Sequence, residues 1–144
     1  MSDTPRISPA EASARLSDGW TYVDVRTTQE FEAGHPAGAV NVPIAHKEGA
    51  NPDFLPVMRA AFGADAKIVV GCKAGSRSAR AAQALVADGF KNVADQRAGW
   101  DGARNPFGQV VEGGWVQAGL PQESGAPAGR SWADMRAKAT PAGA

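Results

Sequence analysis

The sequence of 144 residues contains one cysteine, Cys72, and two histidines, His35 and His46. One cysteine cannot close a disulfide within the chain, so the fold does not depend on an oxidising compartment. These three residues lie far apart in the sequence and lack the spacing of a metal site. We therefore expect a fold held together by its hydrophobic core, with no metal and no other cofactor.

An excess of charge of one sign is also missing. Lys plus Arg number 15 and Asp plus Glu number 15, so the formal net charge is zero, which favours neither a nucleic-acid nor a membrane-surface partner. No apolar run approaches the roughly 20 residues that span a bilayer. The first residues also lack the apolar core of a signal peptide. We expect a soluble, cytoplasmic protein in which any positive field is local.

The hydrophobic content of 43% and the chain length predict one domain with a substantial core. Short apolar strands alternate with helical patterns. The predicted strands are 20–25, 39–43, 67–71 and 91–96, and the predicted helices are 9–17, 28–33, about 51–62 and 78–88. This alternation predicts an α/β fold with a mostly parallel central sheet and helices on both faces.

The pattern changes after the last predicted strand. Residues 98–121 are rich in glycine and aromatic residues, which predicts an ordered surface loop with one or two helical pieces. Residues 122–129 have the composition of a Gly/Pro/Ala/Ser linker, and residues 131–139 have the pattern of a short helix. We therefore predict a domain at residues 1–121, and a linker with a short C-terminal helical tail at residues 122–144.

The most informative segment runs from Cys72 to Ser78, with the sequence CKAGSRS, between a predicted strand and a predicted helix. Such a turn gathers free backbone N–H groups, and the helix dipole favours negative charge there. A thiol beside Lys73 and Arg77 should ionise readily, and the same loop should hold an oxyanion. The segment predicts a thiolate nucleophile that faces an anionic substrate.

Each residue of this segment also has a plainer interpretation. Cys72 alone is typical of a small buried hydrophobe, but Gly75 and Arg77 at this spacing favour a reactive thiolate. Arg77 is either a solvated arginine in the first helical turn, where the positive end of the helix dipole disfavours a cation, or a residue that binds an anion. Lys73 either lines the pocket mouth or points to solvent. Gly75 lets the N–H groups turn inward, and Ser78 steadies the turn.

Three further positions are candidates for supporting roles. Asp24 and Arg26 follow a predicted strand and form either a structural charge pair or a brace behind the cysteine loop. His35, in a Gly/Pro-rich turn, favours a turn-stabilising role over catalysis. Trp100 is the tryptophan that we would test at the rim of the pocket.

Together these residues resemble the rhodanese-like sulfurtransferases. The motifs that carry the resemblance are VDVR at 23–26 followed by Glu30 and Gly34-His35, GAVNVP at 38–43, CKAGSRS at 72–78, which matches C-x-x-G-x-R-S, and WVQAGLP at 115–121. The resemblance covers about residues 7–121. It implies a single rhodanese-like domain with a three-layer fold.

In that family the loop cysteine attacks the outer sulfur of a donor such as thiosulfate, releases sulfite and becomes a persulfide. A thiol, in some cases a protein thiol, or cyanide then accepts the sulfur. The resemblance implies that Cys72 is the nucleophile and sulfur carrier of a thiosulfate:acceptor sulfurtransferase with a small anionic donor. The residues implied to bind the substrate are Lys73, Ala74, Gly75, Ser76 and Arg77. Those implied to support the loop are Asp24, Arg26 and Ser78.

Two features depart from the family pattern. Pro36-Ala37 reverses the usual order after His35, and residues 97–112 form an insertion before the double glycine and tryptophan. Two other functions stay open. A cysteine phosphatase or arsenate reductase uses C-x5-R, one residue longer than the C-x4-R here. A non-catalytic rhodanese-like binding module commonly lacks the cysteine.

Overall fold

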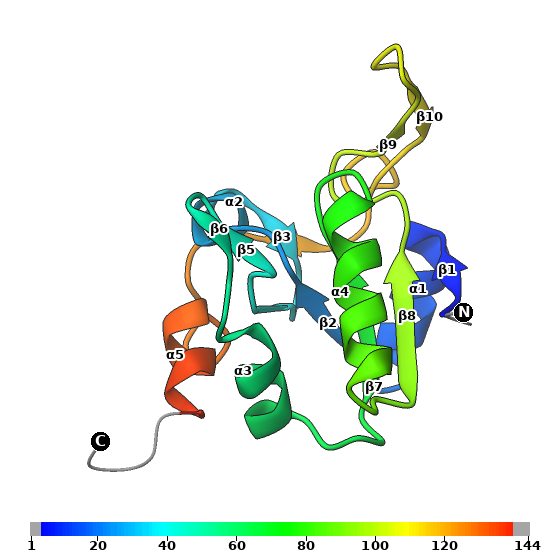
Figure 1. Ribbon diagram of the computed structural model, residues 1–144. Coiled ribbons are helices and arrows are strands. Elements are labelled where there is room, and N and C mark those ends of the chain that lie inside the picture. The colour runs from blue at the N-terminus through cyan, green and yellow to red at the C-terminus, as the bar shows by residue number, and fades with distance from the viewer. Residues whose placement is uncertain (1–3, 140–144) are drawn as a thin grey trace.

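Five parallel strands form the central sheet of the computed structural model, which describes residues 4–139 (Figure 1). The strands are β1 (Arg6–Ile7), β2 (Thr21–Asp24), β4 (Val40–Asn41), β7 (Lys67–Gly71) and β8 (Asn92–Gln96). Their order in the sheet is β1-β8-β7-β2-β4. Strand β7 is thus the central strand and is hydrogen-bonded to a neighbour on each side.

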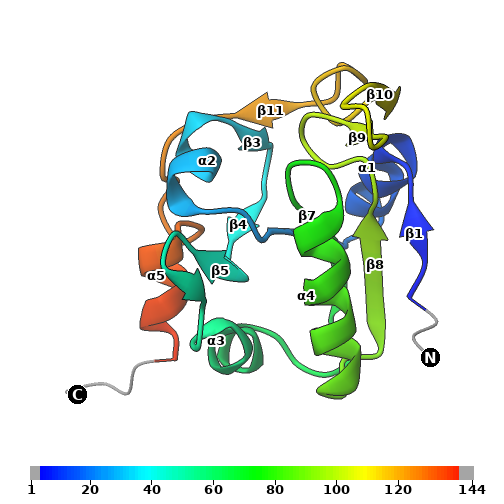
Figure 2. The same cartoon turned by 45° about the horizontal axis from the view of Figure 1, so that its top comes forward.

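Helices cover both faces of this sheet (Figure 2). They are α1 (Pro9–Ser17), α2 (Thr28–Ala33), α3 (Phe54–Ala61), α4 (Ser76–Ala87) and α5 (Trp132–Ala137). Ile68 and Val70 of β7 join a core with α3, α4 and α5, whereas Val69 joins a second core with α1 and Phe31 of α2. Strands buried on both faces read as continuous apolar runs. The predicted α/β three-layer architecture is confirmed.

Local capping signals explain where the first two helices begin. The Ser8 hydroxyl accepts the Glu11 N–H, and the Glu11 carboxylate accepts the Ser8 N–H. Thr27 and Glu30 repeat this capping box at the start of α2. Both helices have the predicted bounds. Helix α4 begins two residues earlier than predicted, because Gly75 precedes it in a left-handed conformation with φ of 103°.

The smaller strand pairs are all antiparallel. Strand β3 (His35–Pro36) pairs with β11 (Gln122–Glu123), β5 (Ala45–His46) with β6 (Gly49–Ala50), and β9 (Ala103–Arg104) with β10 (Val110–Glu112). The helical pieces predicted within 98–121 are wrong, since this segment holds the β9–β10 hairpin and turns. The hairpin projects from the body of the molecule (Figure 1). The Asn105 side chain accepts the N–H groups of Phe107 and Gln109 and closes its tip.

The chain after Pro121 contacts the rest of the molecule at several points. Besides the β3–β11 pairing, the Arg130 carbonyl accepts the N–H of Asn41 in β4. Met135 of α5 is 1% exposed and belongs to the core with α3 and α4. The domain boundary at Pro121 stays a prediction, and in the structure the residues beyond it share the core of the sheet. Within residues 4–139, no helix is sufficiently long and apolar to span a membrane.

Met135→Ala should lower the free energy of unfolding by about 2–5 kcal/mol, because truncation leaves a cavity in the core. Urea denaturation of the full chain, followed by tryptophan fluorescence, measures this change. Lys138→Ala, at an exposed position next to the same helix, is the control and should change the value by less than about 0.5 kcal/mol. Equal, small effects of both variants would contradict the packing of α5 against the sheet.

Candidate active site

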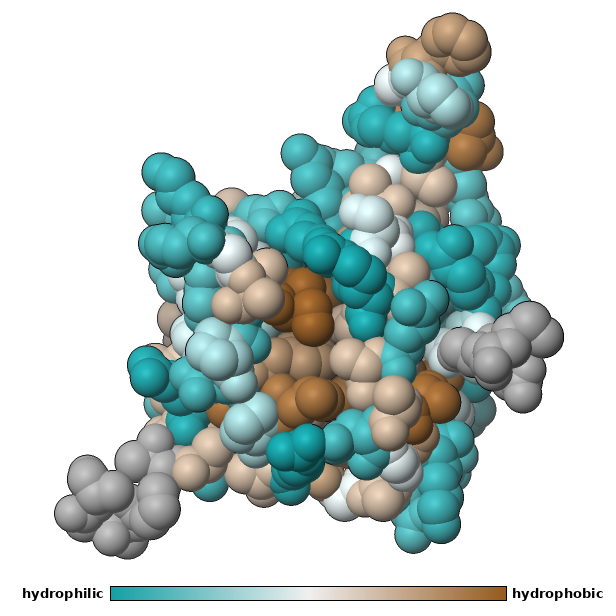
Figure 3. All heavy atoms as spheres, in the orientation of Figure 1, coloured by the Kyte–Doolittle hydropathy of each residue, from teal (hydrophilic) through white to brown (hydrophobic). Residues whose placement is uncertain are grey.

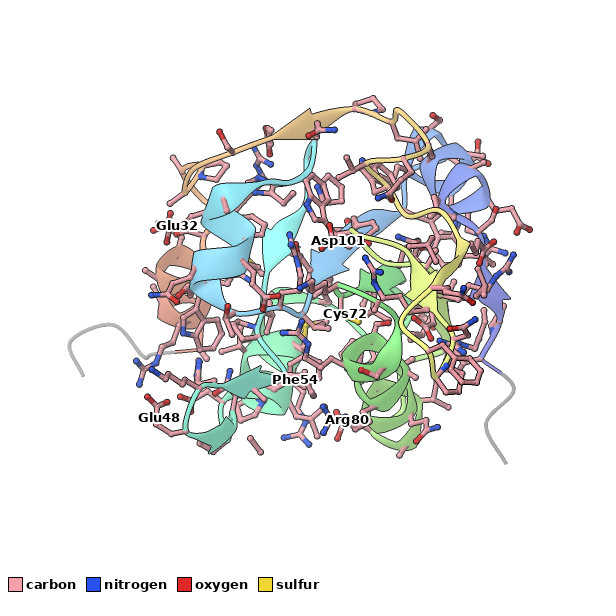
Figure 4. All side chains as sticks on the ribbon, turned by 90° about the horizontal axis from the view of Figure 1, so that it is seen from above. Glu32, Glu48, Phe54, Cys72, Arg80 and Asp101 are labelled. Atoms are coloured by element: carbon pink, nitrogen blue, oxygen red, sulfur yellow. The ribbon has the colours of Figure 1, made fainter. Side chains whose placement is uncertain are left out.

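Cys72 follows directly after β7, at the carboxyl end of the central strand, where open α/β sheets bind ligands. Its side chain is 2% exposed and lies near the centre of the molecule in Figure 4. The sulfur accepts the N–H of Gly75 at 3.1 Å. The thiol lies 3.5 Å from the Ser78 hydroxyl, which itself donates to the Gly75 carbonyl at 3.3 Å. The loop therefore closes around the sulfur.

The carbonyl groups of this loop are bound from outside. The Cys72 carbonyl accepts the N–H of Trp100 at 2.8 Å, and the Lys73 carbonyl accepts the N–H of Asp101 at 2.9 Å. In a trans peptide the C=O and the next N–H point in opposite directions. The N–H groups of Lys73 and Ala74 thus point away from the 100–101 segment. The first N–H groups of α4 have no partner within the helix either, so donors for an anion gather at the loop.

Glycines permit this close approach of two backbone segments. Gly99 has φ of 67°, and a Cβ there would lie 2.5 Å from the Lys73 carbonyl oxygen. A Cβ on Gly75 would lie 2.3 Å from the Arg97 carbonyl oxygen. The buried side chain of Gln96 fixes the turn, since its oxygen accepts the N–H groups of Ala98 and Gly99. Any larger residue at the two glycines would separate the segments.

Arg77 is engaged by an acidic partner that we did not predict. Its guanidinium binds both carboxylate oxygens of Glu30 in α2, at 2.7 and 3.0 Å. Burial raises the pKa of Glu30, but hydrogen bonds from Arg77 and the Thr27 N–H outweigh burial and bring this pKa to about 2. The glutamate is therefore ionised at neutral pH. The role of Arg77 in binding the anionic end of a donor stays a prediction.

Lys73 has a weaker partner. Its ammonium lies 3.9 Å from the Asp101 carboxylate, and both side chains are largely exposed, at 56% and 37%. An exposed pair at this distance contributes little to stability. Lys73 is thus free to turn toward the loop or toward solvent, as the sequence left open.

Asp24 and Arg26 form a buried ion pair behind the loop. The guanidinium binds the carboxylate at 2.7–3.1 Å and also donates to the Gly34 carbonyl at 2.6 Å. Burial lowers the pKa of Arg26, but hydrogen bonds to Asp24 outweigh it and the pKa is raised. The guanidinium lies 5.2 Å from the centroid of the Trp100 ring, and the Trp100 N–H holds the Cys72 carbonyl. This chain of contacts links the ion pair to the cysteine loop, and the role of Asp24 and Arg26 as a brace stays a prediction.

His35 occupies a structural position. One ring nitrogen lies 2.6 Å from the Phe31 carbonyl oxygen, and the other lies 3.0 Å from the Glu123 carboxylate. Its ring stacks on Phe31 at 3.6 Å between centroids. The histidine thus joins α2 to β11. Among residues 4–139, no group of three or more His, Cys, Asp or Glu side chains is arranged to hold a metal ion.

The sequence interpretation named Trp100 for the rim of the pocket but missed Gln96, Gly99 and Asp101 as part of the site. Residues 97–101 belong to the segment that we treated as an insertion of unknown role, and within it the backbone N–H groups of Trp100 and Asp101 bind two carbonyls of the loop. Gly99-Trp100, directly after a predicted strand that neighbours the cysteine strand, was the available signal. The interpretation also missed Glu30 as the partner of Arg77, because 47 residues separate them in the sequence.

Comparison with known proteins places the chain in a family. A family model described as a rhodanese-like domain matches residues 8–105. Thiosulfate sulfurtransferase 16, chloroplastic, of Arabidopsis thaliana is 35% identical over 122 residues, which cover 82% of this chain and 92% of the relative. Thiosulfate sulfurtransferase GlpE of Pseudomonas entomophila is 34% identical over 114 residues, which cover 78% of this chain and 97% of the relative.

A solved structure agrees with these matches. The crystal structure of Rv0390 from M. tuberculosis aligns with a TM-score of 0.73 and 28% identity, over 86% of this chain and 100% of that one. The α/β fold, the cysteine loop at the end of its central strand and these matches lead to one conclusion. The chain belongs to the rhodanese-like domain family, in which relatives about one third identical to it are named as sulfurtransferases.

Proposed function

We propose that this protein is a sulfurtransferase that carries sulfane sulfur on Cys72. The observation that carries the proposal is the loop itself, in which the sulfur accepts the Gly75 N–H at 3.1 Å while carbonyls of Cys72 and Lys73 are held on the outside. Fixed dipoles of this kind stabilise negative charge on a thiolate or a persulfide without reorganisation. The names of the relatives support sulfur transfer as the class of reaction.

In the first half-reaction, the Cys72 thiolate attacks the outer sulfur of the donor. With thiosulfate, a new S–S bond forms on Cys72 and the S–S bond of the donor breaks. The electron pair of the broken bond leaves with sulfite, and Cys72 becomes a persulfide. The Gly75 N–H would stay on Sγ, and the other backbone N–H groups of the loop would hold the terminal sulfur anion.

In the second half-reaction, an acceptor thiolate or cyanide attacks the terminal sulfur of the persulfide. The S–S bond breaks, and its electron pair returns to the Cys72 sulfur as a thiolate. Ser78 would stabilise the anion on Sγ in both half-reactions. Its hydroxyl lies 3.5 Å from Sγ and can turn its proton from the Gly75 carbonyl to the anion.

The cytoplasmic location of the protein stays a prediction.

Incubation with thiosulfate should give a protein that is one sulfur atom heavier, because the persulfide is a covalent intermediate. Intact-mass spectrometry detects it, and the added sulfur should leave on treatment with cyanide. Cys72→Ser keeps the size of the side chain but supplies no thiolate and should show no mass change. A folded wild-type protein that takes no sulfur from thiosulfate or any persulfide would contradict the proposal, as would Cys72-dependent hydrolysis of an aryl phosphate.

Gly75→Ala should lower the rate of persulfide formation by a factor of about 10² to 10³, the effect of losing one donor to a developing anion. The added Cβ would lie 2.3 Å from the Arg97 carbonyl oxygen, so the loop must shift and the Gly75 N–H leaves the sulfur. The rate of mass increase with thiosulfate measures this effect.

Gly89→Ala is the matched control for Gly75→Ala. Gly89 has the same φ of 103°, but a Cβ there meets nothing within 4 Å. Both variants therefore place an alanine at the same positive φ, and only Gly75→Ala disturbs the loop. Equal rates in the two variants would show that the Gly75 N–H does not serve the reaction.

A further inference from the structure

Each cation of the cysteine loop faces an acidic side chain. Arg77 forms its two hydrogen bonds with Glu30, and Lys73 lies 3.9 Å from Asp101. The formal charges of these four side chains sum to zero. Thiosulfate, in contrast, carries two negative charges. The loop thus offers backbone dipoles to an anion, but no excess of positive side-chain charge.

The Arg77–Glu30 pair is a built contact rather than a loose surface pair. The Glu30 carboxylate also accepts the N–H of Thr27 at 3.2 Å and its hydroxyl at 3.1 Å, as part of the capping box of α2. Both partners are partly buried, with side chains 23% and 29% exposed. Bidentate pairs of this kind are strong and geometrically specific. A dianion can use Arg77 only if it competes with a carboxylate that is already in place.

Arg77 lies in the first turn of α4, directly after the cysteine loop. Its pKa is raised first by the hydrogen bonds to Glu30, and the negative charges of Glu30, Cys72 and Asp24 raise it further. The charge on Glu30 therefore opposes, at the same guanidinium, the attraction of any anion that approaches Cys72.

An apolar groove borders α4, the helix that begins at the cysteine loop. It has a volume of about 460 Å³ and lies between the β5–β6 hairpin, α3 and α4. Its walls include Ile44, Phe54, Leu55 and Ala84. Hydrophobic side chains, coloured brown, line this hollow in Figure 3. Phe54 belongs to the same buried cluster as Cys72, and both are labelled in Figure 4. The groove has the size of a small-molecule site, which the few atoms of thiosulfate do not fill.

Arg80 gives this groove a cation at its rim. It follows Arg77 by three residues, so the two side chains share one side of α4. Arg80 is exposed, and no acidic partner binds it among the residues that the structure describes. An apolar wall fits the carbon skeleton of an organic donor, and the cation at its edge adds a partner for a carboxylate where the donor carries one.

From this charge balance and this groove we infer that Glu30 is a specificity-determining residue, which disfavours thiosulfate relative to organic persulfides whose carbon skeleton lies in the groove. The inference rests on the proposed sulfur transfer at Cys72. With such a donor, R–S–SH, the Cys72 thiolate attacks the outer sulfur and forms a new S–S bond. The donor S–S bond breaks, its electron pair leaves as the thiolate R–S⁻, and the proton stays on the transferred sulfur.

Glu30→Gln tests this assignment, because it removes the charge and keeps the shape. The initial rate of persulfide formation on Cys72 is followed by intact mass at increasing concentrations of thiosulfate or of benzyl persulfide. The half-saturating concentration of thiosulfate should fall about tenfold, the value of one charge-assisted hydrogen bond made available. That of benzyl persulfide should change by less than about twofold, since this donor gains little from a free guanidinium.

Glu123→Gln is the matched control. Glu123 is also ion-paired, with Arg130, and has a pKa of about 2, but it lies on β11 and contacts His35 rather than the loop. Glu123→Gln should leave the half-saturating concentrations of both donors unchanged. Ala84→Phe tests the groove independently and should raise the half-saturating concentration of benzyl persulfide while leaving that of thiosulfate unchanged.

The outcomes separate this inference from the proposed function. Loading of Cys72 by neither donor in the wild-type protein would overturn both. If the wild-type protein forms the persulfide but Glu30→Gln changes the half-saturating concentrations of the two donors equally, only the role of Glu30 is overturned. If Ala84→Phe leaves the half-saturating concentration of benzyl persulfide unchanged, only the assignment of the groove is overturned.

Discussion

The cysteine loop depends on hydrogen bonds to the outer side of its backbone. Trp100 and Asp101 donate N–H groups to the carbonyls of Cys72 and Lys73, and the Arg6 guanidinium donates to the carbonyl of Gly75. Each bound carbonyl fixes a peptide plane and so directs the following N–H away from the outer segment. The sulfur then meets donors that need no rearrangement when charge develops. Strand β7 is hydrogen-bonded to β8 and β2 on its two sides, and this pairing fixes the position where the loop begins.

In the proposed function, this arrangement would allow a nearly uncharged environment to stabilise a sulfur anion. The side chains around the loop are paired, as in Arg77–Glu30 and Arg26–Asp24. Paired charges largely cancel at a distance, whereas backbone dipoles aimed at a buried atom act in a low-dielectric interior where they are strong. Cys72 is 2% exposed, so water screens these dipoles little. Under the proposed function, selectivity among sulfur donors would then depend on which neighbouring charge remains available.

The parts of this fold that sequence patterns predicted are those with local causes. Helices 9–17 and 28–33 follow from capping boxes within four residues, and strand 67–71 follows from an apolar run. The contacts of Cys72 with Gly75 and Ser78 are equally local. In contrast, the Arg77–Glu30 pair joins residues 47 positions apart. The β9–β10 hairpin and the packing of Met135 also depend on tertiary contacts, which no short window of sequence contains.

Trp100 connects motifs that lie far apart in the sequence. The Trp100 ring lies beside the Arg26 guanidinium, which Asp24 binds. The backbone N–H of Trp100 donates to the Cys72 carbonyl. A Cβ on Gly34 would lie 2.9 Å from the Trp100 ring, so this glycine admits the tryptophan. In the proposed reaction, Asp24, Arg26 and Gly34 would thus act through position rather than through chemistry. They set where Trp100 lies, and Trp100 sets how the first peptide of the cysteine loop is turned.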